Sequence, residues 1–191
     1  MDNRLAILSF LGKNIETAFT MYDLSRRTKI PYASFYRTLK KMADLLILTP
    51  AGKATLVRLN KHNPLTRHYL IIASKEEKDQ YVKKQPIIKK IADELPPGKY
   101  AVILFGSYVK GTQTAKSDID LLVITSKNWQ PLPLSRYETL FRVRINVIYL
   151  TSEEFTAMLK EKEENLGKQA LKNHIILYNP ERFWNLVYGT R

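Results

Sequence analysis

Hydrophobic residues in the first thirty positions recur with the spacing of short helices. Leu5, Leu8 and Leu11 fall on one side of a predicted first helix. Thr20 is placed to cap a second helix that runs to about Thr28, and the Ile-Pro pair that follows ends it. The chain is therefore predicted to begin with two helices.

A third helix and a β-hairpin are predicted next. The helix covers residues 32–46, because its apolar positions form one stripe at i, i+4, i+7 and i+11. These positions are Phe35, Leu39, Met42 and Leu46. Residues 46–49 and 55–59 are predicted as short strands on either side of a turn that contains Gly52.

Two apolar, β-branched runs dominate the middle of the chain. Helices at residues 65–84 and 87–95 are predicted to precede them. The runs themselves, residues 101–105 and 118–124, are predicted as buried strands. A polar connector with a turn and a short helix joins them.

The remaining residues are predicted to alternate between helices and strands. A loop in which Trp129 packs and a helix at 134–142 lead to a third strand at 143–150. Thr151 or Ser152 then caps another helix. A charged helix at 161–173, a strand at 175–178 and a last helix from Pro180 follow it. The aromatic residues of the last helix are predicted to cover the core as a lid or to form a self-association surface.

The amino-acid composition indicates what kind of partner the protein binds. The chain has 191 residues, and a hydrophobic content of 45% is enough for real cores. It has no cysteine, no apolar run of membrane-spanning length and no signal-peptide pattern, so we expect a cytoplasmic protein without membrane contact. The net charge is +13, of which residues 1–68 carry +8. Such a basic chain favours an anionic partner, with nucleic acid ahead of membrane.

The connector between the two central strands carries the candidate chemistry. Gly106 allows a close approach of the backbone, and Ser107 adds a hydroxyl beside N–H groups at a predicted helix start, which suits a phosphate. Asp118 and Asp120 alternate with Ile119, so their carboxylates point to the same face of a strand. Two adjacent carboxylates repel each other unless a hard cation lies between them, and Mg²⁺ is the natural ligand.

This motif resembles a known family. Gly106-Ser107, ten intervening residues and Asp118-x-Asp120 in a hydrophobic strand are similar to the signature of the polymerase-β-like nucleotidyltransferase superfamily, above all its minimal prokaryotic, archaeal-type members. The resemblance implies an α+β domain in which helices pack on a small mixed sheet. It also implies that the domain binds a nucleoside triphosphate with Mg²⁺.

The resemblance extends to further positions of the connector. Tyr108, Gly111 and Ser117 stand where the family's pattern has an aromatic residue, a glycine and a serine, and Lys110 stands where many members have arginine. It implies that the nucleotide is bound by Gly106, Ser107, Lys110 and Ser117, and that the catalytic, metal-binding residues are Asp118 and Asp120.

One position departs from the family pattern. Members that transfer nucleotides usually have a third carboxylate on the third strand, and the matching residue here is Asn146. Its amide oxygen still suits Mg²⁺, but an amide brings no charge and cannot act as a base near neutral pH. Glu138 and Glu154 are the neighbouring carboxylates, and neither lies on the predicted strand.

The N-terminal segment resembles a winged helix-turn-helix domain. Three short helices and a hairpin form this arrangement, in which the third helix would read the major groove of double-stranded DNA and the hairpin would touch phosphate. The alternative is a helical domain used for protein contacts. The residues predicted to contact DNA are basic or hydrogen-bonding: Arg26, Arg27, Ser34, Tyr36, Arg37, Lys40, Lys41 and Lys53.

The sequence thus predicts a winged helix at residues 1–62, a connecting helix at 63–85 and a nucleotidyltransferase-fold domain at 86–191. In one hypothesis, the protein binds DNA and transfers a nucleotidyl group to an acceptor. In the other, it is a transcriptional regulator whose transferase-like core binds nucleotide with weak or no catalysis. A homodimer is also expected, because winged helices often read paired half-sites.

Overall fold

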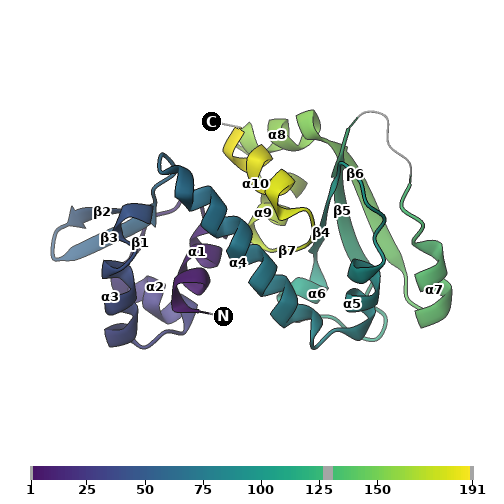
Figure 1. The fold of residues 1–191 in the computed structure, drawn as a ribbon, viewed down its shortest axis with the longest axis horizontal. Coiled ribbons are helices and arrows are strands. Elements are labelled where there is room, and N and C mark those ends of the chain that lie inside the picture. The colour runs from purple at the N-terminus through teal and green to yellow at the C-terminus, as the bar shows by residue number, and fades with distance from the viewer. Residues whose placement is uncertain (1, 127–130, 190–191) are drawn as a thin grey trace. The chain divides into compact units, whose positions relative to one another are not determined.

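The computed structural model describes residues 2–126 and 131–189, so the predicted packing of Trp129 lies outside the described residues. The chain divides into two compact units, Met1–Glu76 and Glu77–Arg191. Figure 1 shows the elements of both units. No helix in the described ranges combines the length and the apolar composition that crossing a membrane requires.

The N-terminal unit consists of helices and a small antiparallel sheet. Its elements are α1 (Asn3–Lys13), β1 (Phe19–Thr20), α2 (Met21–Thr28), α3 (Tyr32–Lys40), the 3-10 helix η1 (Ala43–Leu45), β2 (Leu46–Ala51) and β3 (Ala54–Leu59). The strands pair in the order β1-β3-β2. The predicted cap of α2 is confirmed, because the hydroxyl of Thr20 accepts a hydrogen bond from the N–H of Asp23 at 3.1 Å.

The predicted third helix is too long. Met42 lies beyond the end of α3, and Leu46 begins β2 by pairing with Leu59. Both are nevertheless buried with Phe35 and Leu39. The apolar pattern therefore predicted the burial of all four residues correctly, but the helical conformation only for Phe35 and Leu39. The backbone partners that β3 supplies outweigh the local helical pattern. The hairpin is confirmed, and Gly52 takes a positive φ of 59° at its turn.

Apolar side chains from α1, α2, α3, η1, β2 and β3 form the core of the first unit. They include Leu8, Leu11, Leu24, Phe35, Leu39, Met42, Val57 and Leu59. Leu70 and Ala73 of α4 (Pro64–Val82) are also buried. α4 is one continuous helix whose last residues belong to the second unit.

The second unit is an α+β domain around a mixed four-stranded sheet, as predicted. Its elements after α4 are α5 (Pro86–Asp93), β4 (Ala101–Phe105), α6 (Ser107–Lys110), β5 (Ile119–Thr125), α7 (Ser135–Phe141), β6 (Ile145–Thr151), α8 (Ser152–Lys160), α9 (Leu166–Lys172), β7 (Ile175–Tyr178) and α10 (Pro180–Gly189). The strand order is β6-β5-β4-β7, in which β5 and β6 are parallel and the other pairs are antiparallel.

Both faces of this sheet are covered by helices. Alternate strand residues such as Val102, Leu104 and Val123 pack with Ile88 of α5 and Tyr137 of α7. Helices α8 and α10 contact the sheet strands as well, and Figure 1 shows α8, α9 and α10 gathered together on one side of the sheet. The two central strands are therefore almost entirely buried and hold the connector between them in place.

The C-terminal helix belongs to the core. Phe183 and Trp184 are almost fully buried, and Phe183 packs against Phe155 and His174 with ring centroids 5.7 and 5.0 Å apart. Phe183 and Trp184 thus cover the core, as one alternative predicted, and they are too buried to form a self-association surface. The predicted charged helix at 161–173 is also too long, because the side chain of Asn165 caps α9 and starts it only at Leu166.

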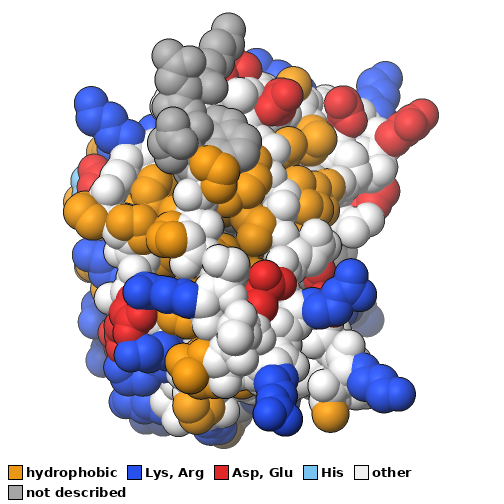
Figure 2. Space-filling model, turned by 90° about the vertical axis from the view of Figure 1, so that its right-hand side faces the viewer, with side chains coloured by type: hydrophobic (Ala, Val, Ile, Leu, Met, Phe, Trp, Pro, Cys, Tyr) orange, Lys and Arg blue, Asp and Glu red, His pale blue; other side chains and the backbone are white. Residues whose placement is uncertain are grey.

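Strand β6 is an edge strand within the described sheet, and glutamates occupy both its ends. The N–H of Ile145 donates to Oε1 of Glu138 at 2.9 Å, and the N–H of Thr151 donates to Oε2 of Glu154 at 2.7 Å. The hydrogen bonds between Glu154 and Thr151, first the one from the Thr151 backbone, lower the pKa of Glu154. Carboxylates at an edge oppose pairing with a further strand. Figure 2 shows hydrophobic side chains gathered on this side of the molecule, with charged residues around them.

Candidate active site

The turn after β4 brings the backbone against a carboxylate. Gly106 has φ 73° and ψ −150°, a conformation that is essentially restricted to glycine. A Cβ atom at this position would overlap Oδ2 of Asp120 and lie 3.0 Å from its Cγ. The close approach of the turn to Asp120 therefore requires glycine, which is the physical reason for the Gly-Ser pair.

Asp120 lies on β5, which is flanked by β4 on one side and β6 on the other. Its Cα is in register with Phe105 on β4 and with Asn146 on β6. Nδ2 of Asn146 donates a hydrogen bond to Oδ1 of Asp120 at 3.1 Å. The structure thus places Asn146 beside the carboxylate of Asp120, and its match to the third acid of the family pattern stays a prediction.

Asp118 lies just before β5 and is partly open to solvent. Its side chain is 39% exposed, and Nε of Arg144 lies 3.9 Å from its Oδ1. The N–H of Ile119 donates to the carbonyl of Arg144 at 2.8 Å. Ile119 separates Asp118 from Asp120, so this bond ties the start of β6 to the pair of aspartates.

The other predicted nucleotide-binding residues lie on the connector. Within the described chain, the N-cap residue of α6 is Gly106, which makes no side-chain cap hydrogen bond. Lys110 is exposed at the end of α6. The hydroxyl of Ser117 accepts a hydrogen bond from the N–H of Thr114 at 2.8 Å. Ser117 therefore shapes the loop, and its contact with nucleotide stays a prediction.

Glu138 and Glu154 do not complete the site. Both carboxylates accept hydrogen bonds from backbone N–H groups of β6, as described above. The described residues contain no group of three or more His, Cys, Asp or Glu side chains that could hold a metal ion. The donor set here is instead two carboxylates and the amide of Asn146.

This donor set fits Mg²⁺. The ion prefers oxygen ligands and usually takes one or two carboxylates, waters and substrate phosphates rather than a complete protein cage. Asp118 and Asp120 would supply the carboxylates, and the amide oxygen of Asn146 would become available if its side chain turned over. When bound, the ion would offset the repulsion between the carboxylates and polarise a phosphate.

Tyr81 holds the short helix α6 in place, a role that the sequence pattern did not indicate. Its hydroxyl donates to the carbonyl of Tyr108 on α6 at 3.0 Å. Burial, with a smaller contribution from Tyr108, raises the pKa of Tyr81 to about 12. Burial also raises the pKa of Tyr100 to about 12. Both phenols are therefore protonated donors at neutral pH.

The raised pKa of Tyr81 makes the second unit sensitive to alkali. Because the folded pKa exceeds the unfolded value of 10.0, the associated stability is complete below about pH 10 and is lost as the pH rises toward 12. We expect Tyr81→Phe to lower the free energy of unfolding by about 1 kcal/mol at neutral pH and to flatten its decline in alkali. Denaturant unfolding followed by tryptophan fluorescence from about pH 8 to pH 12 measures this. Equal pH slopes for parent and variant would contradict it.

The residues predicted to contact DNA lie on α2, on α3 or directly after it, and in the hairpin turn of the first unit. All but Ser34 are exposed. Arg26 lies over the ring of Tyr22, and Lys40 lies over the ring of Tyr36, with 5.9 and 4.7 Å to the centroids. Arg27 forms an ion pair with Asp23, which partly neutralises its charge.

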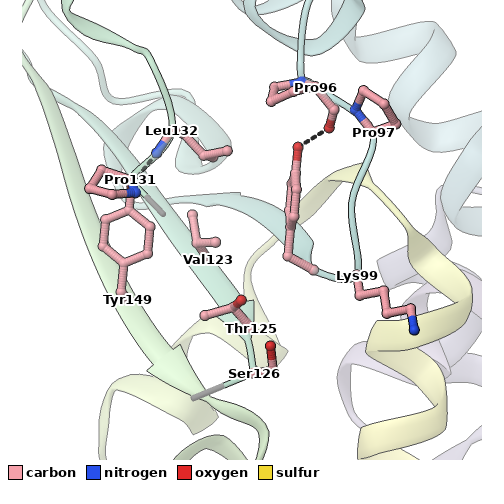
Figure 3. A pocket seen from close by; sticks show the side chains of 10 residues that line it. Pro96, Pro97, Lys99, Val123, Thr125, Ser126, Pro131, Leu132 and Tyr149 are labelled. Atoms are coloured by element: carbon pink, nitrogen blue, oxygen red, sulfur yellow. Dashed lines mark hydrogen bonds between the residues drawn. The ribbon is translucent and has the colours of Figure 1, made fainter. Parts of the chain in front are cut away.

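A separate cavity of about 320 Å³ lies in the second unit, at the end of the sheet opposite the aspartates. It is lined by Thr125, Tyr149 and Pro97, among others, as Figure 3 shows. The hydroxyl of Tyr149 accepts a hydrogen bond from the N–H of Leu132 at 2.9 Å. Thr125 ends β5, whereas Asp120 lies near its start, so this cavity is distinct from the site at the aspartates.

Comparison with known families decides what this domain is. The model of the family described as "Nucleotidyltransferase domain" matches residues 85–187. The chain belongs to the nucleotidyltransferase domain family. A protein of Methanocaldococcus jannaschii described as "Putative protein adenylyltransferase" is 31% identical to this chain over 103 residues, which cover 50% of this chain and 67% of the relative. No solved structure matches the chain significantly.

Proposed function

We propose that this chain is a DNA-binding protein whose nucleotidyltransferase domain transfers an adenylyl group from Mg-ATP to a hydroxyl of a protein side chain. The observation that carries the proposal is the convergence of the Gly106 turn, Asp120 and Asn146 in a member of this family. The choice of ATP and of a protein acceptor rests on the description of the archaeal relative.

The chain's own residues would act on the triphosphate and the acceptor. The turn at Gly106 and Ser107 would bind phosphate through N–H groups and a hydroxyl, and Asp118 and Asp120 would hold Mg²⁺. The acceptor oxygen would bond to the α-phosphorus and release its proton to water. The bond to the α–β bridging oxygen would break, and its electron pair would leave with pyrophosphate.

A transfer assay tests the proposal. The full chain is incubated with ATP labelled at the α-phosphate, with and without Mg²⁺, in the presence of candidate acceptor proteins. We expect label to become covalently attached to protein only with Mg²⁺. Labelling that is absent with every acceptor, although nucleotide and Mg²⁺ bind, would instead favour the regulator with a weak or inactive core.

Asn146 controls how fast transfer is. Asn146→Asp changes almost no volume and adds a negative charge and a proton acceptor beside Asp120. Because general-base assistance is typically worth about 10²–10⁴-fold in rate, we expect slow transfer by the parent and a rate at least as high for the variant. The variant should also bind Mg²⁺ more tightly and keep its melting temperature. A fast parent and a slower Asn146→Asp would show that another residue supplies the base.

For the first unit, we propose a winged helix-turn-helix that binds duplex DNA. Its support is the arrangement of three helices and a β-hairpin, with exposed cations at the end of α3 and directly after it: Arg37, Lys40 and Lys41. We propose residues 1–62 as the DNA-binding domain, 63–85 as the connecting helix and 86–191 as the transferase domain. Dimerisation on paired half-sites stays a prediction.

The DNA proposal is tested with the full chain. We expect affinity for duplex DNA to fall steeply with salt, and the double change Arg37→Ala and Lys40→Ala to weaken binding about tenfold or more at moderate salt. The variant should also show a shallower salt dependence. Lys83→Ala with Lys84→Ala is the matched control, because these lysines are exposed in the second unit. Fluorescence anisotropy that shows equal losses for both double variants would contradict specific binding by α3.

A further inference from the structure

An arginine that the family motif does not include stands at the edge of the candidate site. Arg144 directly precedes β6, and its carbonyl accepts the hydrogen bond from Ile119 at 2.8 Å. This bond fixes its backbone beside the strand residue that separates Asp118 and Asp120. Its side chain is 86% exposed, and its Nε is 3.9 Å from Oδ1 of Asp118. The backbone of Arg144 is thus held in place, while its guanidinium is exposed to solvent.

The contact between Arg144 and Asp118 is a weak one. At 3.9 Å the two atoms are beyond hydrogen-bond distance. Exposed ion pairs of this kind contribute about 0–1 kcal/mol. A divalent cation attracts the same carboxylate more strongly and is also drawn by Asp120. Metal binding would therefore release the guanidinium from Asp118 at little cost.

The charges of the site give the released guanidinium an anionic partner. Asp118 and Asp120 bring two negative charges, which one Mg²⁺ balances, while Asn146 is neutral. A nucleoside triphosphate then adds several negative charges, and pyrophosphate takes up more as it leaves. An arginine fork binds phosphate oxygens in bidentate fashion and stays charged at every relevant pH.

We propose that Arg144 is a polyphosphate-binding residue of this site, which exchanges Asp118 for the phosphates of the nucleotide when the metal binds. The inference rests on the proposed nucleotidyltransferase function. It assigns to Arg144 two opposite effects. The guanidinium competes with the metal for Asp118 when no nucleotide is present, and it attracts the triphosphate once the metal is bound.

The test compares the parent chain with Arg144→Gln in two binding measurements. Mn²⁺ alone is titrated and its free form is followed by electron paramagnetic resonance. The Mg²⁺ complex of ATP with a methylene group between its α- and β-phosphates is titrated by calorimetry. We expect Arg144→Gln to bind Mn²⁺ on the order of 2- to 5-fold more tightly, because a nearby positive charge is gone. It should bind the nucleotide about tenfold or more weakly, the usual loss for a charged hydrogen bond.

Two further variants separate charge, geometry and folding. Arg144→Lys keeps the charge but not the fork, so we expect unchanged Mn²⁺ affinity and a partial loss of nucleotide affinity. Arg58→Gln removes the same group from an exposed position in the first unit and should change neither affinity. Melting temperatures should match the parent, since the Arg144 side chain is largely exposed.

The outcomes distinguish this inference from the proposed function. Parent protein that binds the nucleotide, with Arg144→Gln binding it equally well, would overturn the role of Arg144 alone. Weakening of both Mn²⁺ and nucleotide binding in Arg144→Gln would show a structural role and overturn the proposal as well. A parent that binds no nucleotide at all would overturn the proposed function itself.

Discussion

Replacing Asp120 by alanine is expected to abolish Mg²⁺-dependent nucleotide transfer and to remove the effect of Mg²⁺ on triphosphate binding. Asp120 is in register between β4 and β6 and meets both the Gly106 turn and the amide of Asn146. Changes in groups that merely support metal ligands cost about 10–100-fold in metal affinity, so the loss of a ligand should cost at least as much. Calorimetry of the ATP analogue with and without Mg²⁺ measures the effect.

A matched control for this variant is Asp93→Ala. Asp93 is an exposed carboxylate of the same unit, at the end of α5, where it pairs with Lys89. Its loss should change neither the metal dependence nor the rate of transfer. If Asp120→Ala and Asp93→Ala behaved alike, or if Asp120→Ala still responded to Mg²⁺ as the parent does, the metal would bind elsewhere.

Gly106→Ala is expected to damage both folding and nucleotide binding. The backbone conformation at Gly106 costs a residue with a Cβ about 1–3 kcal/mol, and the Cβ would also displace the carboxylate of Asp120. We therefore expect a lower melting temperature together with an affinity for the nucleotide at least about tenfold weaker, since the displaced carboxylate no longer holds the metal. Thermal unfolding and calorimetry on the same preparation measure the two effects.

Gly111→Ala separates the strain from the displacement of the carboxylate. Gly106 and Gly111 flank the two ends of α6. Gly111 also has a positive φ, 70°, but a Cβ there would meet no atom within 4 Å. This variant should lose about 1 kcal/mol of stability and keep its nucleotide affinity. Equal losses of affinity at Gly106 and Gly111 would show that the turn matters only for folding.

Local patterns in the sequence predicted most elements because each has its own signal. The β-branched runs at 101–105 and 118–124, the Thr20 cap and the Gly52 turn depend on residues close in sequence. The third helix was predicted to be too long, since Met42 continues the apolar spacing although the backbone has already left the helix. Strand β1, with only two residues, exists through its pairing with β3 and has no local pattern.

The candidate site was predictable only in part for the same reason. The spacing of Asp118 and Asp120 is visible in the sequence, and Asn146 was singled out through the resemblance to the family. The tether from Tyr81 to α6 and the contact of Arg144 with Asp118 join residues 27 and 26 positions apart in sequence. An arginine two residues before Asn146 was visible in the sequence, but no local rule brings its side chain to Asp118.

The central claim is that Asp118 and Asp120 form a metal-dependent triphosphate site, and calorimetry of the parent chain tests it most directly. The full chain is titrated with the methylene analogue of ATP, once with Mg²⁺ and once with Mg²⁺ removed by a chelator. The account predicts an affinity at least about tenfold higher with Mg²⁺, since the ion both offsets carboxylate repulsion and binds phosphate. Equal affinity in the two titrations would contradict it.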